Sequence, residues 1–431
     1  MYFKKGIIAV LLFMLCGAER VSAEEIFEWQ KCVMEAEHNH PDLIAAKEKL
    51  VQSIETKNVT RSGLLPQISS NVSESTANNT SSSGGDANYR YPTTFSYGVS
   101  GEQLLFDGFK TVYDVRTAEE NIKSAQYNYE VVSSNIRLSL RTAFSDLLSA
   151  QELLNVTESI AARRKQNMEL VKLRYEGGRE HRGSYMTAEA DLAEANFEVE
   201  QAKRAIYVAQ RLLSKELGRS KMPEPLEAQG DFSVKENCAA MPDFENMADT
   251  NPLLKQLVAK KEAAKYGVKS AKAEFFPTVY ANAGSGNSYS VSPPGKEEWS
   301  FGTSVSFPLF EGGKRLADVA KAKAVYNQTQ ADELSGRNGV IYTLAKTWSA
   351  LANAVEKVNV QKKYLEAATE RAKIAEAEYS TGLLTFDNWI IIEDNLVSAK
   401  KNYLAAEQAA LLAEANWIQA KGGTLDYDKK Q

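Results

Sequence analysis

The sequence predicts a mixed α and β membrane protein made of two tandem structural repeats, each ordered helix, β-hairpin, long helix and return helix. The first observation is a set of duplicated motifs. Leu-Phe-Asp-Gly at 105–108 returns as Leu-Phe-Glu-Gly at 309–312, and Tyr-Glu-Gly-Gly at 175–178 returns as Tyr-Ser-Thr-Gly at 379–382, each 204 residues later. The second observation is that apolar residues in each half change from helical spacing to strict alternation and back. The third is an export signal at the amino terminus.

Residues 1–23 have the order of a cleavable secretory signal. Two lysines precede an apolar run over 6–15, and a Val-Ser-Ala sequence ends at Ala23. The apolar run is too short to span a bilayer. Cys16 raises the alternative of a lipidated amino terminus, but Leu15 stands where a lipoprotein signal normally has a small residue. We therefore expect cleavage after Ala23, with lipidation as the open alternative.

Composition and motifs argue against several functional classes. The formal net charge is −5, and removal of residues 1–23, which carry three basic residues and one acidic residue, leaves −7. A nucleic-acid partner would need a basic face. The chain has no Walker-type phosphate loop, serine elbow or dinucleotide fingerprint. His38 and His40 lack the spacing of a metal site, so a polar helix start before Pro41 is preferred over a metal role. We predict that the protein is not an enzyme and uses no cofactor or metal ion.

Two cysteines remain after removal of the signal, Cys32 and Cys238. Each lies shortly before two prolines 25 residues apart, which are Pro41 and Pro66 in the first half and Pro252 and Pro277 in the second. In an oxidising compartment, a disulfide between them would tie the start of the first half to the linker before the second. Two unpaired small residues are the alternative, and the sequence leaves both open.

Each repeat begins with a helix and a hairpin. Residues 42–64 and 253–275 are rich in Ala, Lys, Glu and Leu, with apolar positions three and four residues apart, which predicts helices that stop before the next proline. The period then changes to two over about 66–106 and 277–310, which predicts two hairpins. One face of each second strand is apolar, and the other carries Ser and Gly.

Four strands cannot close a sheet. A hairpin with unpaired edges is a liability in water and impossible in lipid, so we expect the edges to pair with other copies in a tilted outer-membrane barrel. Three copies would give twelve strands, although the number three is not derivable from the residues. The apolar face would then meet lipid. The candidate lipid-facing strand residues are Phe95, Tyr97, Val99, Trp299, Phe301, Val305 and Phe307.

After the hairpins, the helical period resumes at Gly108 and Gly312 and continues for about 65 residues without a proline. At ~1.5 Å per residue, such a helix is roughly 100 Å long, far more than a globular domain needs. Beyond the turns at Gly178 and Gly382, a return helix of about 34 residues follows. The return helix and the helix before the hairpin together are nearly as long as the long helix. Stacked end to end beside it, they would form a rod in each repeat.

These elements divide the chain into segments. They are a signal peptide, 1–23; a first repeat, 24–220, with its hairpin at about 66–106, long helix at about 109–175 and return helix at about 184–217; an inter-repeat linker, 221–250; a second repeat, 251–423, with its hairpin at about 277–310, long helix at about 313–379 and return helix at about 387–421; and a C-terminal tail, 424–431.

The order of these features resembles the TolC-like outer-membrane efflux protein family, over nearly all of the mature chain. The resemblance rests on the signal peptide, the two-fold repeat, the proline before each first strand, Leu-Phe-(Asp/Glu)-Gly at each strand exit and Tyr-x-x-Gly at each helical turn. It implies a homotrimer whose strands form a 12-stranded barrel in the cell outer membrane, continued by a periplasmic α-helical barrel. It further implies a passive exit duct of a tripartite efflux or type I secretion system. An inner-membrane pump of RND or ABC type and a periplasmic adaptor protein would deliver substrates into the duct.

The resemblance also assigns the helical turns to a periplasmic tip that meets the adaptor and closes the channel. The matching adaptor-facing positions are Tyr175, Gly178, Tyr379, Gly382 and Leu383. Ordinary turn chemistry, in which glycine supplies a left-handed residue at a helix end, is the alternative. Leu383, Leu384 and Phe386 make the second turn apolar, as an exposed docking surface would be.

Some family members narrow the tip with acidic residues six and nine positions after the second glycine, where this chain has Asn388 and Ile391. Asp387 is therefore the candidate periplasmic gate residue here, with Glu393 and Asp394 close in sequence. The alternative for Asp387 is a solvated or N-capping aspartate.

Two other protein classes compete with the channel. A soluble periplasmic coiled-coil scaffold would explain the helices but would leave the aromatic strand faces exposed to water. A general porin would explain the strands, but four strands in one chain cannot close and need no long helices. The sequence does not distinguish drugs, metals or polypeptides as the transported substrate, nor the class of pump.

Overall fold

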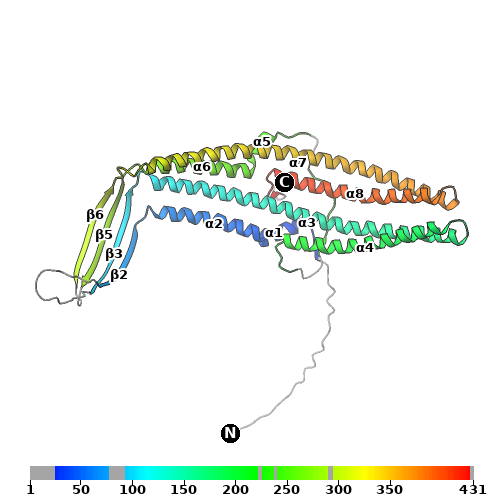
Figure 1. Cartoon of the computed structure of the whole chain (residues 1–431), viewed down its shortest axis with the longest axis horizontal. Helices are drawn as coiled ribbons and strands as arrows, with labels where there is room; N and C mark the ends of the chain where they lie inside the picture. Colours follow the sequence, from blue (N-terminus) through cyan, green and yellow to red (C-terminus); the bar gives the residue numbers. More distant parts are fainter. Residues whose placement is uncertain (1–24, 77–92, 222–225, 237–239, 290–294, 428–431) are drawn as a thin grey trace, which may run out of the picture.

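The computed structural model of the chain describes residues 25–76, 93–221, 226–236, 240–289 and 295–427. The molecule is elongated (Figure 1). A four-stranded sheet lies at one end, and helices run lengthwise from the sheet to the opposite end. The predicted signal peptide, with Cys16, falls outside the described residues.

Two long helices form the frame of the molecule. They are α3 (Lys110–Glu176) and α7 (Lys314–Thr381), with 67 and 68 residues. At ~1.5 Å per residue, each is roughly 100 Å long. Neither contains a proline, so the backbone hydrogen-bond ladder is unbroken along the whole rod. Within the described ranges, every helix is too polar or too short to be a candidate for crossing a membrane.

Two shorter helices lie along each long helix. In the first repeat they are α2 (Pro41–Ser62) and α4 (Arg182–Glu216), which both contact α3. In the second repeat they are α6 (Pro252–Ala273) and α8 (Phe386–Ala420), which both contact α7. Figure 1 shows α2 and α4 following one another along α3. Because α6 and α8 also contact α3, the two repeats form one helical bundle.

The joints between the shorter helices are built in the same way in both repeats. His40 precedes Pro41, accepts a hydrogen bond from the Asp42 amide on Nδ1 (3.2 Å), and lies 3.6 Å from the carboxylate of Glu216 at the end of α4. Its counterpart Asn251 caps α6 and donates to the carbonyl of Ala420 at the end of α8 (2.8 Å). In each repeat, one polar residue thus caps the start of one short helix and contacts the end of the other short helix. His40 is the polar helix start that was preferred over a metal ligand.

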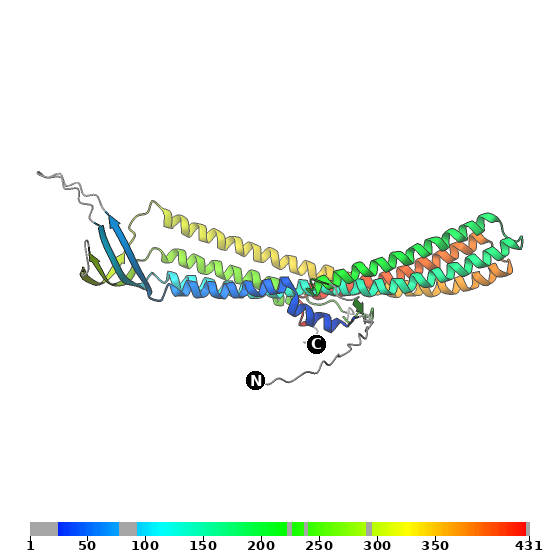
Figure 2. The same ribbon diagram turned by 90° about the horizontal axis from the view of Figure 1, so that it is seen from below.

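A small layer of elements, here called the middle layer, packs against the bundle about halfway along it (Figure 2). It contains β1 (Glu25–Phe27), α1 (Trp29–Asn39), β4 (Leu226–Ala228) and α5 (Phe244–Thr250). β1 and β4 pair in parallel, so the amino terminus is joined to the segment that follows α4. Phe27, Leu140, Leu213 and Leu226 form part of one buried cluster there, which fixes the layer to α3 and α4.

The sheet is antiparallel throughout, with the strand order β2-β3-β5-β6. Its strands are β2 (Gln67–Thr76), β3 (Thr93–Phe106), β5 (Thr278–Tyr289) and β6 (Lys296–Ser306). The two predicted hairpins are therefore joined through β3 and β5 into one sheet, and β2 and β6 are its edges.

The last strand ends earlier than the sequence predicted. Phe307 was counted among the strand residues, but β6 stops at Ser306. Pro308 follows Phe307 and has no amide hydrogen for a strand ladder, so pairing ends before it.

Candidate functional site

The register of the sheet sorts its side chains into two faces. Directly opposed residues of antiparallel strands project to the same side. Ser285 is opposite both Val99 and Trp299, and Tyr97 is opposite Val72, so these residues share one face. This apolar face consists chiefly of Ile68, Val72, Phe95, Tyr97, Val99, Val279, Tyr289, Trp299, Phe301 and Val305.

The apolar face is uncovered in the single chain. Trp299 is 80% exposed and Phe301 is 74% exposed. Phe95 stacks on Tyr289 with ring centroids 5.5 Å apart, so the aromatic rings form a continuous surface rather than isolated residues. Each square ångström of apolar surface left in water costs roughly 25 cal/mol, and contiguous patches of this kind mark an interaction with another apolar phase or partner.

The opposite face, here called the polar face, carries hydroxyls, amides and glycines. The hydroxyl groups of Ser69 and Ser100 are 2.9 Å apart, and Asn282 donates to the Ser304 hydroxyl over 3.1 Å. Gly286 is opposite Gly98, and a Cβ added at Gly286 would lie 2.9 Å from a backbone oxygen. Most side chains here are small and hydrophilic, which suits a surface that faces water, and the larger Leu104 and Tyr280 lie on this face near the helical end.

At the far end of the molecule, Tyr379 is buried rather than presented at a surface. Its ring stacks on Trp389 with centroids 4.2 Å apart, and the Arg174 guanidinium lies 4.6 Å from the ring centroid. The Tyr379 hydroxyl donates to the carboxylate of Glu180 in the other turn (3.0 Å). The expectation that Tyr379 faces the adaptor is therefore corrected, because its side chain fills the space between the two turns.

This contact also changes the chemistry of the phenol. Burial, the hydrogen bond to Glu180 and the charge of that carboxylate together raise the pKa of Tyr379 above its ordinary value. Arg174 completes the connection by donating to the backbone carbonyl of Tyr379 (2.6 Å). The α3–α4 turn and the α7–α8 turn are thus tied to each other through one tyrosine and one arginine.

The other residues assigned to the tip are at the surface. Leu383 is 82% exposed, and Tyr175 is partly exposed and stacked on Tyr185. Gly178 and Gly382 both have positive φ, +69° and +84°, which is the ordinary turn chemistry left open above. Phe386 is buried against Tyr379, so the apolar surface of the second turn is smaller than the sequence suggested.

The acidic residues of α8 have different environments. Asp387 is exposed in the first turn of the helix, and the N-cap position is Thr385 rather than Asp387. Glu393 is buried and receives two hydrogen bonds from Arg163 of α3, of 2.5 and 2.7 Å. Asp394 pairs with Arg164 of α3. Glu393 and Asp394 are thus each paired with an arginine of α3, although Asp394 is also exposed. Among the described contacts, Asp387 is the one of the three without such an ion pair.

Sequence reasoning missed the arginine pair that forms these contacts. Arg163 also contacts Glu376 of α7 (3.2 Å), and Arg164 lies 3.8 Å from Asp191 of α4. Two adjacent residues of α3 therefore contact α4, α7 and α8. The sequence does contain a signal for Arg164. This arginine lies at helical spacing between Ile160 and Asn167, which are both buried, so a charged residue stands within the buried side of α3.

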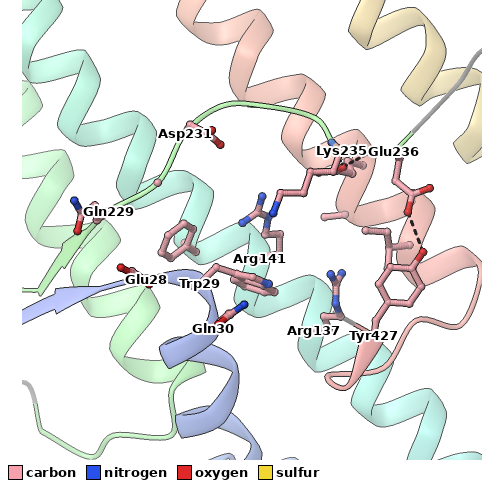
Figure 3. Close-up of a pocket in the computed structure, with 15 residues that line it drawn as sticks. Glu28, Trp29, Gln30, Arg137, Arg141, Gln229, Asp231, Lys235, Glu236 and Tyr427 are labelled. Atoms are coloured by element: carbon pink, nitrogen blue, oxygen red, sulfur yellow. Dashed lines mark hydrogen bonds between the residues drawn. The ribbon is translucent and has the colours of Figure 1, made fainter. Parts of the chain in front are cut away.

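The middle layer contains a cavity of about 810 Å³. Figure 3 shows Arg137 between the rings of Trp29 and Tyr427, and its guanidinium carbon lies 5.5 and 5.2 Å from the two ring centroids. Arg141 continues the series between Trp29 and Phe144, at 5.0 and 5.8 Å. Stacking of this kind joins the amino-terminal segment, α3 and the C-terminal segment.

The linker that borders this cavity is held by two carboxylates, of which Glu414 is buried and Glu236 is partly buried. Glu414 of α8 accepts hydrogen bonds from the amides of Lys235 and Glu236 (2.6 and 3.0 Å). Glu236 in turn binds Lys421 (2.9 Å), and this contact lowers the pKa of Glu236 against the opposing effect of burial. The lining mixes arginine, lysine and carboxylate groups, which indicates a structural joint between three chain segments.

The structure describes one partner of the candidate disulfide. Cys32 is buried, and burial together with the charge of Glu35 raises the pKa of its thiol to about 12. Cys238 lies outside the described residues, so the pairing stays a prediction. In the part of the chain that the structure describes, no group of three or more His, Cys, Asp and Glu side chains is arranged to hold a metal ion.

Comparison with known proteins gives one family. A model of the outer membrane efflux protein family matches residues 33–219 and 245–423. Outer membrane efflux protein BepC of Brucella suis biovar 1 (strain 1330) is 21% identical over 337 residues, which cover 77% of this chain and 73% of that protein. Outer membrane protein TolC of Escherichia coli (strain K12) is 23% identical over 454 aligned positions, covering 98% of this chain and 87% of that protein.

Solved structures show the same fold. The Campylobacter jejuni CmeC outer membrane channel superposes with a TM-score of 0.81 at 17% identity, over 93% of this chain and 88% of that one. The open state of the Neisseria gonorrhoeae MtrE outer membrane channel gives a TM-score of 0.81 at 18% identity, over 93% and 90%. The predicted fold class, two repeats that combine long helices with a small sheet, is therefore confirmed.

Proposed function

Because this chain belongs to the outer membrane efflux protein family and so forms an outer-membrane channel, we propose that the channel is the exit duct of a tripartite efflux or type I secretion system. The observation that carries the proposal is the sheet with one apolar face, one polar face and two unpaired edges, joined to helices roughly 100 Å long. The alternative of a soluble periplasmic scaffold is not supported, because it accounts for neither the apolar face nor the family.

The edges of the sheet support assembly into a barrel. Neighbouring strands in the order β2-β3-β5-β6 alternate in direction, so β2 and β6 run opposite ways. The β6 edge of one copy can therefore pair in antiparallel fashion with the β2 edge of the next. Three copies give twelve strands, and the 10 to 14 residues per strand suffice for a tilted outer-membrane strand.

In this assembly the apolar face meets lipid and the polar face lines the water-filled lumen. Phe95, Tyr97, Val99, Trp299, Phe301 and Val305 would contact lipid directly. Phe307 would lie beyond the strand, at the helical edge of the membrane, where aromatic side chains are favoured. The helices would extend from there through the periplasm.

The far turns would meet a periplasmic adaptor, which connects the duct to an inner-membrane pump. The proposal places Leu383, Tyr175, Gly178 and Gly382 at this contact, because they lie at the tips of the helical hairpins and are exposed. Asp387 remains the proposed gate residue, since its carboxylate is exposed close to the turn. Its replacement by alanine should raise single-channel conductance or alter cation block, and unchanged behaviour in both would reject the assignment.

The substrate is proposed from the relatives. One relative is named an antibiotic efflux pump outer membrane protein and another a toluene efflux pump outer membrane protein, each 22% identical over 302 residues. These names favour efflux of small molecules over secretion of polypeptides. The pump class, RND or ABC, would follow from which pump co-purifies with the channel after chemical cross-linking.

A pair of adjacent substitutions tests the duct. Phe301→Lys places a charge on the apolar face of β6, and Ser300→Lys places the same charge on the polar face one residue away. A lysine facing the bilayer midplane costs about 2–4 kcal/mol, whereas a lumen lysine does not. We expect the Ser300 variant, like the parent chain, to run as a detergent-resistant trimer from outer-membrane extracts, and the Phe301 variant to be lost. Equal behaviour of the two variants, or a parent chain found only in the soluble periplasm, would reject the barrel.

A further inference from the structure

We propose that Glu102 sets the ionic selectivity of the barrel section of this channel, by placing a ring of carboxylates on its inner face. The inference rests on the proposed trimeric barrel, in which each copy contributes one Glu102. It concerns the strand section and is separate from the helical turns, where Asp387 lies.

The register places Glu102 on the polar face. Glu102 of β3 is directly opposite Gln67 of β2 and Asn282 of β5. It lies two residues from Ser100, whose hydroxyl contacts Ser69 on that same face. Because side chains two residues apart on a strand share a face, the Glu102 carboxylate must project to the side of the serines and glycines.

Glu102 has no partner that would neutralise its charge. Its side chain is exposed, and within the described ranges no ion pair or hydrogen bond of its carboxylate is found. The neighbouring amides are directed elsewhere. Gln67 donates to the backbone carbonyls of Ser62 and Leu65, and Asn282 donates to Ser304. Glu102 therefore contributes a formal charge of −1 to this face.

The rest of the polar face does not offset this charge. Among the described strand residues, the other charged side chains on this face are Lys296 and Glu298, both near the hairpin end of β6 and opposite in sign. The register level between Glu298 and Glu102 carries only serine and glycine, at Ser69, Ser100, Gly284 and Ser300. Near the helical end, Glu102 therefore dominates the electrostatic potential of the inner face.

The size of the effect follows from the barrel geometry. Twelve strands spaced ~4.8 Å apart and tilted by ~40° enclose a backbone radius of roughly 12 Å. Three inward carboxylates would then lie roughly 9 Å from the axis. Coulomb's law in water, with screening, predicts that cations at the axis are enriched about fivefold at 0.01 M salt and about two- to threefold at 0.1 M.

The test compares two glutamates of the same sheet that lie on opposite faces. Glu74 of β2 is directly opposite Phe95, which puts its side chain on the apolar face. Reversal potentials would be measured in planar bilayers under a KCl gradient, with the dilute solution on the barrel side. We expect Glu102→Gln to lower the ratio of K⁺ to Cl⁻ permeability at least twofold, and Glu74→Gln to leave it unchanged. Glu102→Asp should keep the ratio, and Glu102→Lys should shift it toward Cl⁻.

Each outcome decides a different point. A Glu102→Gln channel with wild-type selectivity would overturn this inference while leaving the duct itself intact, since current would still flow. A shift with Glu74→Gln and none with Glu102→Gln would show that the faces are inverted and would also overturn it. Absence of any channel current from the parent chain would reject the proposed function, and the inference with it.

Discussion

Replacement of Glu393 by glutamine would test the buried ion pair that ties α3 to α8. Glu393 accepts hydrogen bonds from Arg163 Nε (2.5 Å), from Arg163 Nη2 (2.7 Å) and from the side-chain amide nitrogen, Nδ2, of Asn167 (3.3 Å). Glutamine keeps the shape of the side chain and one oxygen acceptor but removes the negative charge. The substitution therefore isolates the charge from the packing.

The expected cost follows from the environment of the pair. Removing one partner of a buried ion pair typically costs about 3–5 kcal/mol. Arg163 keeps a second carboxylate, Glu376, at 3.2 Å, and its side chain is 28% exposed, so water and Glu376 compensate in part. We expect about 2 kcal/mol, which corresponds to roughly a 30-fold change in an equilibrium constant.

Hydrogen exchange with detection by mass spectrometry can measure this locally. In the detergent-solubilised protein, amides of α8 around Glu393 should lose roughly 30-fold of their protection, whereas amides of the middle layer should be unchanged. Asp394→Asn is the matched control, because that carboxylate is 59% exposed and should matter less. The double variant Arg163→Met with Glu393→Leu should recover protection, because both charges are removed together.

Two results would refute this reasoning. Wild-type exchange in Glu393→Gln would show that the ion pair does not hold α8 against α3. A double variant that exchanges faster than Glu393→Gln would show that packing, and not the unpaired charge of Arg163, determines the effect.

Three further predictions concern single positions. The pKa of Tyr379 is raised, so the stability that its neutral form contributes is present below about pH 10 and is lost as the pH rises through the folded-state value. The melting temperature of Tyr379→Phe should therefore fall less steeply with rising alkaline pH than that of the parent chain. An equally steep fall in both chains, measured in a pH series of thermal melts, would contradict this. Gly218→Ala should destabilise by more than about 1 kcal/mol, because φ is +78° and the new Cβ would lie 2.3 Å from a backbone oxygen. The control Gly267→Ala, where no atom lies within 4 Å, should raise the melting temperature slightly. Phe109 has φ +68° where the second repeat has Gly313, so Phe109→Gly should stabilise the chain by about 1 kcal/mol in denaturant titrations, and a lower midpoint would show that the exposed ring contributes more than the strain costs.

The helices could be predicted closely from the sequence because their signals are local. Long helices were expected over about 109–175 and 313–379, and the structure has them at Lys110–Glu176 and Lys314–Thr381. The absence of proline and the glycines at the turns are properties of neighbouring residues, and they decide where a helix begins and ends. The early end of β6 has the same kind of local signal, because Pro308 follows two residues after Ser306.

The environment of the tip residues could not be predicted in this way. Tyr379 belongs to a turn motif, and such motifs are usually exposed, yet its ring is enclosed by Trp389 and Arg174. Trp389 lies ten residues further along the chain, and Arg174 comes from the other repeat. A helical period shows which side of one helix is apolar, but it does not show which neighbour covers that side.

Taken by itself, the sequence determined the order of the elements, the duplication, the length of the rod and the two-faced strands, because these depend on composition and spacing along the chain. Only the tertiary structure decided that β3 pairs with β5 so that both hairpins form one sheet, that Glu102 and Glu74 lie on opposite faces of it, and that Arg163 binds Glu393. The physical reason is that register and side-chain pairing join residues tens to hundreds of positions apart. Their free energy arises when separate elements exclude water from a shared surface, which no local pattern records.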